Sequence, residues 1–222
     1  KYNTMQIQHF EDLPLSSETM KGIEELGFGS LFPIQAQAII PLLEGKDVIG
    51  QAQTGTGKTA AFGIPMVERL NPTINNVQAL VLEPTRELAI QVAEHISRFG
   101  KYAKIKVSPI YGGEPIQKQI KALKNGVHIV VGTPGRIIDH LKRGTLNLTL
   151  AKIVVLDEAD RMLDMGFKDD VEYILSRISA NRQTSLFSAT IDQQVMNICN
   201  RYMRSPEKIL VSKEEIALTQ MN

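Results

Sequence analysis

The chain has 222 residues, of which 43% are hydrophobic and 22% charged, and its formal net charge is +1. This composition is typical of a globular protein and excludes collagen-like, disordered and strongly charged chains. The single cysteine, Cys199, excludes an internal disulfide bond and a cysteine-based zinc site, and no apolar run approaches the ~18 residues that a membrane span needs. One cysteine also suits a reducing compartment, so we expect a cytoplasmic protein with no membrane partner.

Short β-branched runs recur along the chain, with helix-like segments between them. After predicted helices at 16–26 and 33–43, strands are expected at 47–52, 79–83, 107–110, 127–131, 153–156, 184–187 and 208–211. Further helices are expected at 58–70, 86–99, 134–142 and 192–203. The strand runs are continuous and do not alternate, which is typical of parallel strands covered on both faces. We therefore predict an α/β fold with a doubly wound, mostly parallel sheet of about seven strands and helices on both faces.

A phosphate-binding loop is predicted between the strand at 47–52 and the helix at 58–70. Its residues are Gln53, Thr54, Gly55, Thr56, Gly57, Lys58 and Thr59, preceded by Ala52 where the P-loop pattern has its first glycine. Glycines let successive backbone N–H groups face a phosphate, and the start of a helix favours an anion. In this pattern the lysine reaches the outer phosphates and the threonine hydroxyl holds Mg²⁺. The loop therefore predicts a site for a nucleoside triphosphate.

Two adjacent carboxylates follow the predicted strand at 153–156. Asp157 can hold Mg²⁺ through water, and Glu158 can orient or deprotonate an attacking water. An acidic surface loop is the alternative for this pair alone, because 157–172 contains seven acidic residues. Together with the phosphate-binding loop, the two carboxylates favour hydrolysis of a nucleoside triphosphate. We predict Lys58, Asp157 and Glu158 as catalytic residues and Thr59 and Asp157 as Mg²⁺ ligands.

The sequence Asp-Glu-Ala-Asp at 157–160, after the phosphate loop, resembles the DEAD-box ATP-dependent RNA helicases, and the resemblance covers residues 10–211. Other motifs of that family's first RecA-like domain follow in order. They are Gly27-Phe28 with Pro33-Ile34-Gln35 for the Q motif, Pro84-Thr85-Arg86-Glu87-Leu88 for motif Ia, Gly112-Gly113 for the GG motif, Thr133-Pro134-Gly135-Arg136 for motif Ib, and Ser188-Ala189-Thr190 for motif III. One departure is Leu31-Phe32, where the Q motif usually has Pro-Thr.

The resemblance implies ATP and Mg²⁺ as cofactors and assigns the adenine base to the Q motif. A glutamine amide offers a donor and an acceptor that match adenine N7 and N6. The resemblance gives this role to Gln35, with Phe28 and Phe10 packing near the base. Surface solvation is the alternative for a lone glutamine in a helix, and core packing is the alternative for the two phenylalanines.

The resemblance also implies that RNA is bound through its backbone, without sequence preference. The implied contacts are Pro84, Thr85, Arg86, Gly112, Gly113, Thr133, Pro134, Gly135 and Arg136. Two of these three segments lie in 101–143, which has nine basic and two acidic residues and can attract phosphates. A solvated lysine face is the alternative for that stretch, and a structural salt bridge is the alternative for each arginine.

The resemblance also implies that Ser188 and Thr190 contact Asp160, and that these contacts transmit the state of the bound nucleotide to the RNA-binding residues. A simple turn is the alternative for this segment. The family's second domain supplies arginine fingers from a His-Arg…Gly-Arg motif, and here the one Gly-Arg pair is Gly135-Arg136 and there is no His-Arg pair. We therefore expect residues 1–211 to be the first domain, with Q-motif helices at 10–45, and the polar 212–222 to begin an interdomain linker.

The leading hypothesis is the ATP-binding and RNA-binding first domain of an RNA helicase that couples ATP hydrolysis to local duplex unwinding or remodelling of RNA–protein complexes. The isolated chain is expected to be monomeric and nearly inactive. The alternatives are a non-catalytic nucleotide- or RNA-binding module and a DNA-directed helicase of the same superfamily.

Overall fold

The computed structural model describes residues 7–211, and within that range seven strands form one sheet in which every neighbouring pair is parallel. The strands are β1 (Val48–Gln51), β2 (Ala79–Leu82), β3 (Val107–Ile110), β4 (Ile129–Gly132), β5 (Ile153–Leu156), β6 (Gln183–Ser188) and β7 (Glu207–Leu210). Their order across the sheet is β3-β4-β2-β5-β6-β1-β7. The predicted α/β fold with a parallel sheet is confirmed. The predicted linker at 212–222 lies outside the described residues.

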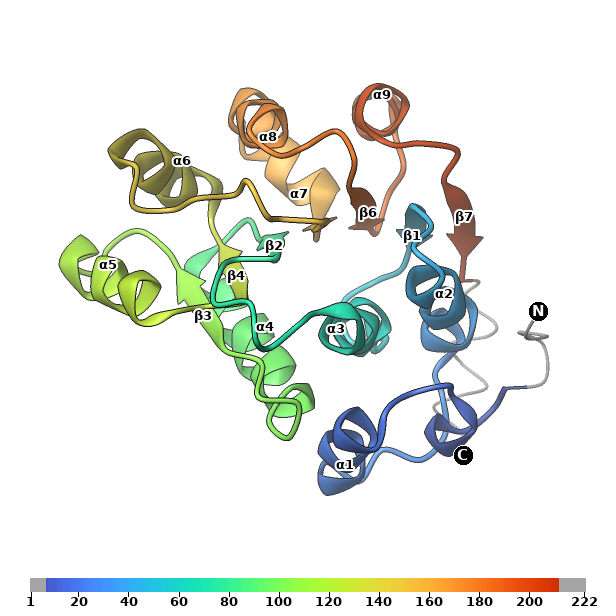
Figure 1. The fold of residues 1–222 in the computed structure, drawn as a ribbon. Coiled ribbons are helices and arrows are strands. Elements are labelled where there is room, and N and C mark those ends of the chain that lie inside the picture. Colours follow the sequence, from blue (N-terminus) through green and yellow to red (C-terminus); the bar gives the residue numbers. More distant parts are fainter. Residues whose placement is uncertain (1–6, 212–222) are drawn as a thin grey trace.

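Helices cover both faces of the sheet (Figure 1). They are η2 (Phe10–Asp12), α1 (Ser17–Glu25), α2 (Pro33–Leu43), α3 (Lys58–Arg69), α4 (Arg86–Phe99), α5 (Ile116–Asn125), α6 (Pro134–Arg143), α7 (Ala159–Asp164), α8 (Lys168–Ser176) and α9 (Gln193–Tyr202). Figure 1 shows α1 to α4 on one side of the strands and α6, α8 and α9 on the other. The acidic segment that follows β5 forms α7 and α8, so it is not the surface loop that its composition allowed.

Two apolar cores form because successive residues of each strand point to opposite faces. Val81 and Val155 face the core shared with α2, α3 and α4, whereas Leu80 and Val154 face the core shared with α6 to α9. Strands buried on both faces need apolar residues at nearly every position, which explains the continuous runs in the sequence. Cys199 lies in the second core and is buried. No helix within 7–211 has both the length and the apolar character required to cross a bilayer.

The amino-terminal helices are tied to α3 by a cluster of hydrogen bonds. The Glu68 carboxylate accepts from the Ser16 backbone N–H at 2.8 Å, from the Ser16 hydroxyl at 2.9 Å and from the Thr19 hydroxyl at 2.6 Å. The Phe10 ring packs on Phe28, with centroids 5.5 Å apart. These contacts fix the segment that precedes α2 against the helix that follows β1.

Gly50 in β1 provides a test of this packing, because a Cβ atom there would lie 2.6 Å from the ring of Phe187 in β6. We expect Gly50→Ala to lower the free energy of unfolding by about 1–3 kcal/mol through overpacking. The double variant with Phe187→Leu should recover part of the loss, because the ring is then absent. Urea unfolding followed by circular dichroism measures both changes; a Gly50→Ala variant as stable as the unsubstituted chain would contradict this account of the β1–β6 contact.

Candidate functional site

Apart from the Q motif, which precedes β1, every segment that the sequence analysis selected lies at the carboxyl edge of the sheet. The phosphate loop follows β1, the acidic pair follows β5, and Ser188 ends β6. The other three segments follow β2, β3 and β4. Because β5, β6 and β1 are neighbours in the sheet, the predicted nucleotide-binding segments after them form one half of this edge, which we call the nucleotide half. Because β3, β4 and β2 are also neighbours, the predicted RNA-binding segments after them form the other half, which we call the basic half. The two halves meet between β2 and β5.

The phosphate loop is shaped by glycines in the left-handed region. Gly55 has φ 83°, and Gly57, the residue before α3, has φ 81°. A Cβ atom on Gly57 would collide with the amide of Gln35 and with the ring of Phe32. Ala52 has no such positive φ, so alanine fits at the position of the pattern's first glycine. The loop thus ends at the amino terminus of a 12-residue helix, where backbone N–H groups favour an anion.

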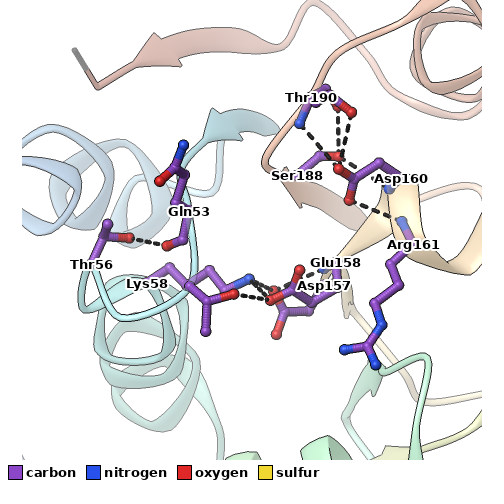
Figure 2. Close-up of polar contacts among 10 residues, drawn as sticks. Gln53, Thr56, Lys58, Asp157, Glu158, Asp160, Arg161, Ser188 and Thr190 are labelled. Carbon is purple, nitrogen blue, oxygen red and sulfur yellow. Dashed lines mark hydrogen bonds and ion pairs between the residues drawn. The ribbon is translucent and has the colours of Figure 1, made fainter. Parts of the chain in front are cut away.

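Lys58 lies in a buried ion cluster with the two predicted catalytic carboxylates (Figure 2). Its Nζ is 3.0 Å from Asp157 Oδ1 and 2.5 Å from Glu158 Oε1. Burial alone would lower the pKa of the Lys58 ammonium, but the charges and hydrogen bonds of the two carboxylates outweigh it and raise that pKa. The lysine is therefore charged and faces the carboxylates, and a bound phosphate would compete with them for it.

The backbone of Glu158 is strained. Its φ is 52° and its ψ is 46°, a left-handed conformation that costs a residue with a side chain about 1–3 kcal/mol. Its N–H donates to Asp157 Oδ1 at 3.0 Å, and the Thr54 hydroxyl donates to its Oε1 at 3.3 Å. In this conformation the Glu158 carboxylate meets Lys58 beside that of Asp157, so the strained residue belongs to the ion cluster itself.

Glu83 was not predicted as a site residue, yet it belongs to this cluster. It follows β2, its exposed fraction is 0%, and neither carboxyl oxygen has a hydrogen-bond partner. Burial, followed by the charge of Asp157, raises the pKa of the Glu83 carboxyl well above 4.5, with Lys58 acting in the opposite direction. The only signal in the sequence was a glutamate at the end of an otherwise apolar strand.

Oxygen atoms suited to a hydrated Mg²⁺ gather at this point. Within 7–211, no group of three or more His, Cys, Asp or Glu side chains forms a complete metal site. Mg²⁺ with a nucleotide needs only one or two protein ligands, because phosphates and waters supply the rest. The predicted ligands Thr59 and Asp157 line one cavity, and the unpartnered oxygens of Glu83 lie beside Asp157. The residues present therefore fit such an ion.

That cavity measures ≈ 480 Å³ and lies between the Q-motif residues, the phosphate loop and α4. A volume of this size suits a ligand as large as a nucleotide. Phe28 and Phe32, with exposed fractions of 40% and 41%, line its apolar wall. Phe10, at 3%, is buried behind Phe28 and does not line it, so core packing describes Phe10 better than direct contact with a base.

Gln35 already joins two parts of the site. Its Oε1 accepts from the Phe32 backbone N–H at 2.9 Å, and its Nε2 donates to the Gly57 carbonyl at 3.0 Å. A primary amide has two N–H donors and an acceptor with two lone pairs, so one of each remains. The side chain is buried rather than solvated, and its free donor and acceptor match the adenine pattern predicted from the sequence.

The contacts predicted between Asp160 and the end of β6 are present (Figure 2). Asp160 Oδ2 accepts from the Thr190 hydroxyl at 3.0 Å and from the Thr190 N–H at 3.2 Å. The Asp160 N–H donates to the Ser188 hydroxyl at 3.1 Å, which donates to the Thr190 carbonyl at 2.7 Å. Burial opposes ionisation of Asp160, but these hydrogen bonds lower its pKa. The segment is therefore more than a simple turn.

The basic half brings the segments after β2, β3 and β4 together. The exposed Arg86 guanidinium lies over the Tyr111 ring, 4.9 Å from its centroid. Arg136 is half-buried, and its Nη1 donates to the Glu114 carbonyl at 2.8 Å and to Gln119 Oε1 at 3.1 Å. Neither arginine forms a salt bridge within the described residues.

Two of the residues predicted to contact RNA are not at the surface of this structure. Pro84 and Pro134 are buried, and proline has no backbone N–H to offer a phosphate. Pro134 instead occupies the first position of α6, where its fixed φ suits a helix start. Gly112, Gly113 and Gly135 are exposed, and Thr85 and Thr133 are partly so. The exposed set is therefore smaller than the sequence predicted.

Comparison with known proteins identifies what this arrangement resembles. The family model for the DEAD/DEAH box helicase matches residues 32–198. The chain is 56% identical over 209 residues to the DEAD-box ATP-dependent RNA helicase CshA of Geobacillus kaustophilus, covering 94% of this chain and 45% of that protein. It is 53% identical over 212 residues to CshA of Bacillus subtilis, covering 96% of this chain and 43% of that protein. The chain thus spans slightly less than half the length of these relatives.

Among solved structures, the chain is similar to a DEAD box protein from the hyperthermophile Methanococcus jannaschii. The TM-score is 0.89 and the sequence identity 45%, and the match covers 92% of this chain and 56% of that one. At this identity the likeness extends beyond the fold alone.

The raised pKa of Glu83 predicts a specific pH dependence of stability. A carboxyl with a raised pKa binds its proton more tightly in the folded chain than in the unfolded chain, so its contribution to stability falls as the pH rises above 4.5 toward the folded-state pKa. We expect Glu83→Gln to be as stable as the unsubstituted chain in acid and increasingly more stable as the pH rises through that range. Urea unfolding at several pH values, with divalent metals chelated, measures the difference.

Glu87→Gln is the matched control, because Glu87 is exposed in the first turn of α4. It shares the substitution but not the burial, so it measures what the loss of an exposed carboxyl contributes to stability at each pH. A stability difference for Glu83→Gln that changes with pH no more than that for Glu87→Gln would show that the buried carboxyl does not hold a proton more tightly in the folded state.

Proposed function

Because the chain belongs to the DEAD/DEAH box helicase family, we propose that it is the ATP-binding and RNA-binding domain of an ATP-dependent RNA helicase. The observation that carries this proposal is the buried cluster of Lys58 with Asp157 and Glu158 in the lining of the nucleotide-sized cavity. A phosphate-binding lysine, a metal-side carboxylate and an adjacent general base are the parts that hydrolysis of a phosphoanhydride requires.

In this proposal each residue of the cluster exchanges its present partner for a part of the substrate. Lys58 turns from the carboxylates to the outer phosphates, and the N–H groups before α3 hold the same phosphates. Glu158 orients the attacking water and takes its proton. Asp157 and Thr59 would hold the metal. Mg²⁺, when bound, neutralises charge on the phosphate oxygens.

Adenine is the proposed base because Gln35 keeps one donor and one acceptor free and lines the same cavity as Phe28. The Asp160 network with Ser188 and Thr190 is the proposed route by which phosphate contacts affect the opposite half of the sheet edge. RNA is proposed to lie across Arg86, the Gly112-Gly113 turn and Arg136, held by its backbone. Coupled ATP and RNA binding would then distort a duplex locally.

Two other functions would share much of this geometry. A module that binds nucleotide or RNA without turnover would not need the strained Glu158, whose conformation favours an enzyme. A DNA-directed helicase is distinguished by competition between RNA and DNA strands of the same sequence. Preference for the RNA strand supports the proposal, and equal binding or preference for DNA contradicts it.

Nucleotide choice tests the role of Gln35. We expect the unsubstituted chain to prefer ATP to GTP, and Gln35→Ala to lose about 1–3 kcal/mol of that preference, because guanine presents an acceptor where adenine has a donor. The chain has no tryptophan, so titration calorimetry is the measurement. Gln37→Ala, on the same helix, is the control and should keep the preference. Equal affinity of the unsubstituted chain for the two nucleotides would exclude this role.

The rate of ATP hydrolysis tests whether a second RecA-like domain is needed for activity. We propose that the 222 residues bind ATP with Mg²⁺ but release phosphate at near-background rates with or without RNA, because an arginine finger contributes roughly 10³–10⁵ in rate and the printed sequence has no motif to supply it. Covalent addition of a second RecA-like domain should restore RNA-stimulated turnover. In that protein Glu158→Gln should abolish phosphate release while ATP binding is retained. Vigorous RNA-stimulated turnover by the 222 residues alone would contradict the proposal.

RNA binding tests the basic half. We expect Arg86→Ala and Arg136→Ala to weaken every single-stranded sequence alike, and each to reduce the slope of log affinity against log salt by about 0.7 per lost phosphate contact. Fluorescence anisotropy of labelled oligonucleotides measures both. Arg177→Ala is a matched control. Arg177 lies 5.0 Å from the centroid of the Tyr173 ring, as Arg86 lies over the Tyr111 ring, but Arg177 is at the end of α8 and outside the basic half. Strong preference for one sequence would argue against backbone binding.

A further inference from the structure

A buried amide lies beneath the basic half of the sheet edge. Gln119 in α5 has an exposed fraction of 2%, and its four hydrogen-bonding positions are all used. Nε2 donates to the Tyr111 carbonyl at 2.9 Å and to Glu114 Oε2 at 3.0 Å. Oε1 accepts from Arg136 Nη1 at 3.1 Å and from His140 Nε2 at 2.9 Å. No motif of the sequence included this residue.

The two donor contacts of Gln119 tie both ends of the glycine turn. Tyr111 directly precedes Gly112, and Glu114 directly follows Gly113, whose φ of 89° is one that glycine adopts without strain. A turn of two exposed glycines has little side-chain packing of its own to fix it. One amide that binds the residues before and after the turn therefore restricts its conformation.

The acceptor contacts of Gln119 fix an arginine on the neighbouring segment. Arg136 Nη1 donates both to Gln119 Oε1 and to the Glu114 carbonyl, so this end of the guanidinium points inward. A guanidinium has five N–H groups in a rigid plane. With Nη1 engaged, the edge formed by Nε and Nη2 is left for an outside acceptor, and that edge can bind a phosphate through two parallel hydrogen bonds.

His140 completes the cluster and fixes the orientation of the amide. The imidazole is buried, and its Nδ1 lies 2.7 Å from the Thr145 hydroxyl. Because a carbonyl oxygen only accepts, Nε2 must carry a proton toward Gln119 Oε1. Burial, and then the charge of Arg136, lower the pKa of His140, so the ring adds no permanent charge behind the arginine.

We propose that Gln119 is a positioning residue for RNA: its amide holds the Gly112-Gly113 turn and the Arg136 guanidinium in the relative placement in which both bind one RNA backbone. Arg86 joins the same arrangement through Tyr111, whose ring lies under its guanidinium and whose carbonyl is bound by the amide. The inference rests on the proposed function, because it assumes that this half of the edge binds RNA.

The test compares Gln119→Met with Gln183→Met. Gln183 is also a buried amide with an arginine partner: Nε2 donates to the Leu42 and Lys46 carbonyls at 3.0 and 2.7 Å, and Oε1 accepts from Arg69 at 2.6 Å. It begins β6, so it lies at the amino end of its strand, away from the basic half. Both variants should lower the melting temperature, because both remove buried hydrogen bonds.

RNA binding separates the two variants. Anisotropy of a labelled single-stranded RNA is measured over a range of salt, with ATP affinity measured by calorimetry. We expect Gln119→Met to weaken RNA binding about tenfold and to reduce the salt slope by about 0.7, as for one lost phosphate contact, with ATP affinity unchanged. Gln183→Met should leave both RNA parameters unchanged. In the Arg136→Ala background, Gln119→Met should add little, because the two act through one contact.

Any other result contradicts either the positioning role of Gln119 or the proposed function. If Arg136→Ala weakens RNA binding and Gln119→Met changes neither the affinity nor the slope, the positioning role is wrong and the proposed function stands. If Gln119→Met weakens binding and Arg136→Ala does not, the positioning role is also wrong. If the unsubstituted chain does not bind RNA, the proposed function fails. Should Gln119→Met not fold, Gln119→Asn, whose shorter side chain cannot reach all four partners, replaces it.

Discussion

A parallel sheet covered by helices on both faces leaves its strand ends as the place where polar groups can gather. Here every strand runs in the same direction, so the motif segments that follow β1 to β6 all leave the same edge. The lateral order then decides which motifs meet. Because β2 lies beside β5, the basic segments and the nucleotide segments share a border, and Glu83 and Asp157 lie on either side of it.

The buried cluster at that border constrains how the nucleotide site can work. One ammonium, Lys58, faces Asp157 and Glu158, and a third carboxyl, Glu83, has no donor at all. Removing one partner from a buried ion pair is costly, because it leaves an uncompensated charge. Lys58 can therefore turn toward a phosphate only when another cation takes its place beside Asp157. Nucleotide and metal would then be bound together, in an exchange of partners for Lys58 and Asp157.

The fold, and the positions of the residues proposed for the nucleotide site, could be predicted because their signals are local. The strand at β5 and the helices α2 and α4 have the predicted bounds, since apolar runs and caps specify them directly. Lys58 and Asp157 are 99 positions apart, yet each ends a strand-and-loop pattern that is visible by itself. The sequence pattern did not indicate which strands lie side by side or which side chains cover one another. The environment of Glu83 depends on β2 lying beside β5, and the burial of Phe10 depends on Phe28 covering it.

Buried glutamines illustrate the same limit, and they show why an amide suits these positions. Gln35, Gln119 and Gln183 each join separate segments of the chain. The sequence distinguishes Gln35 from a solvated glutamine only through its motif, and it does not distinguish Gln119 or Gln183 at all. A neutral amide can be fully hydrogen-bonded without a counter-ion, whereas a buried carboxylate in its place would pair with the neighbouring arginine and cancel its charge. At position 119 this difference matters most. The amide holds Arg136 in place and leaves its positive charge available to a phosphate.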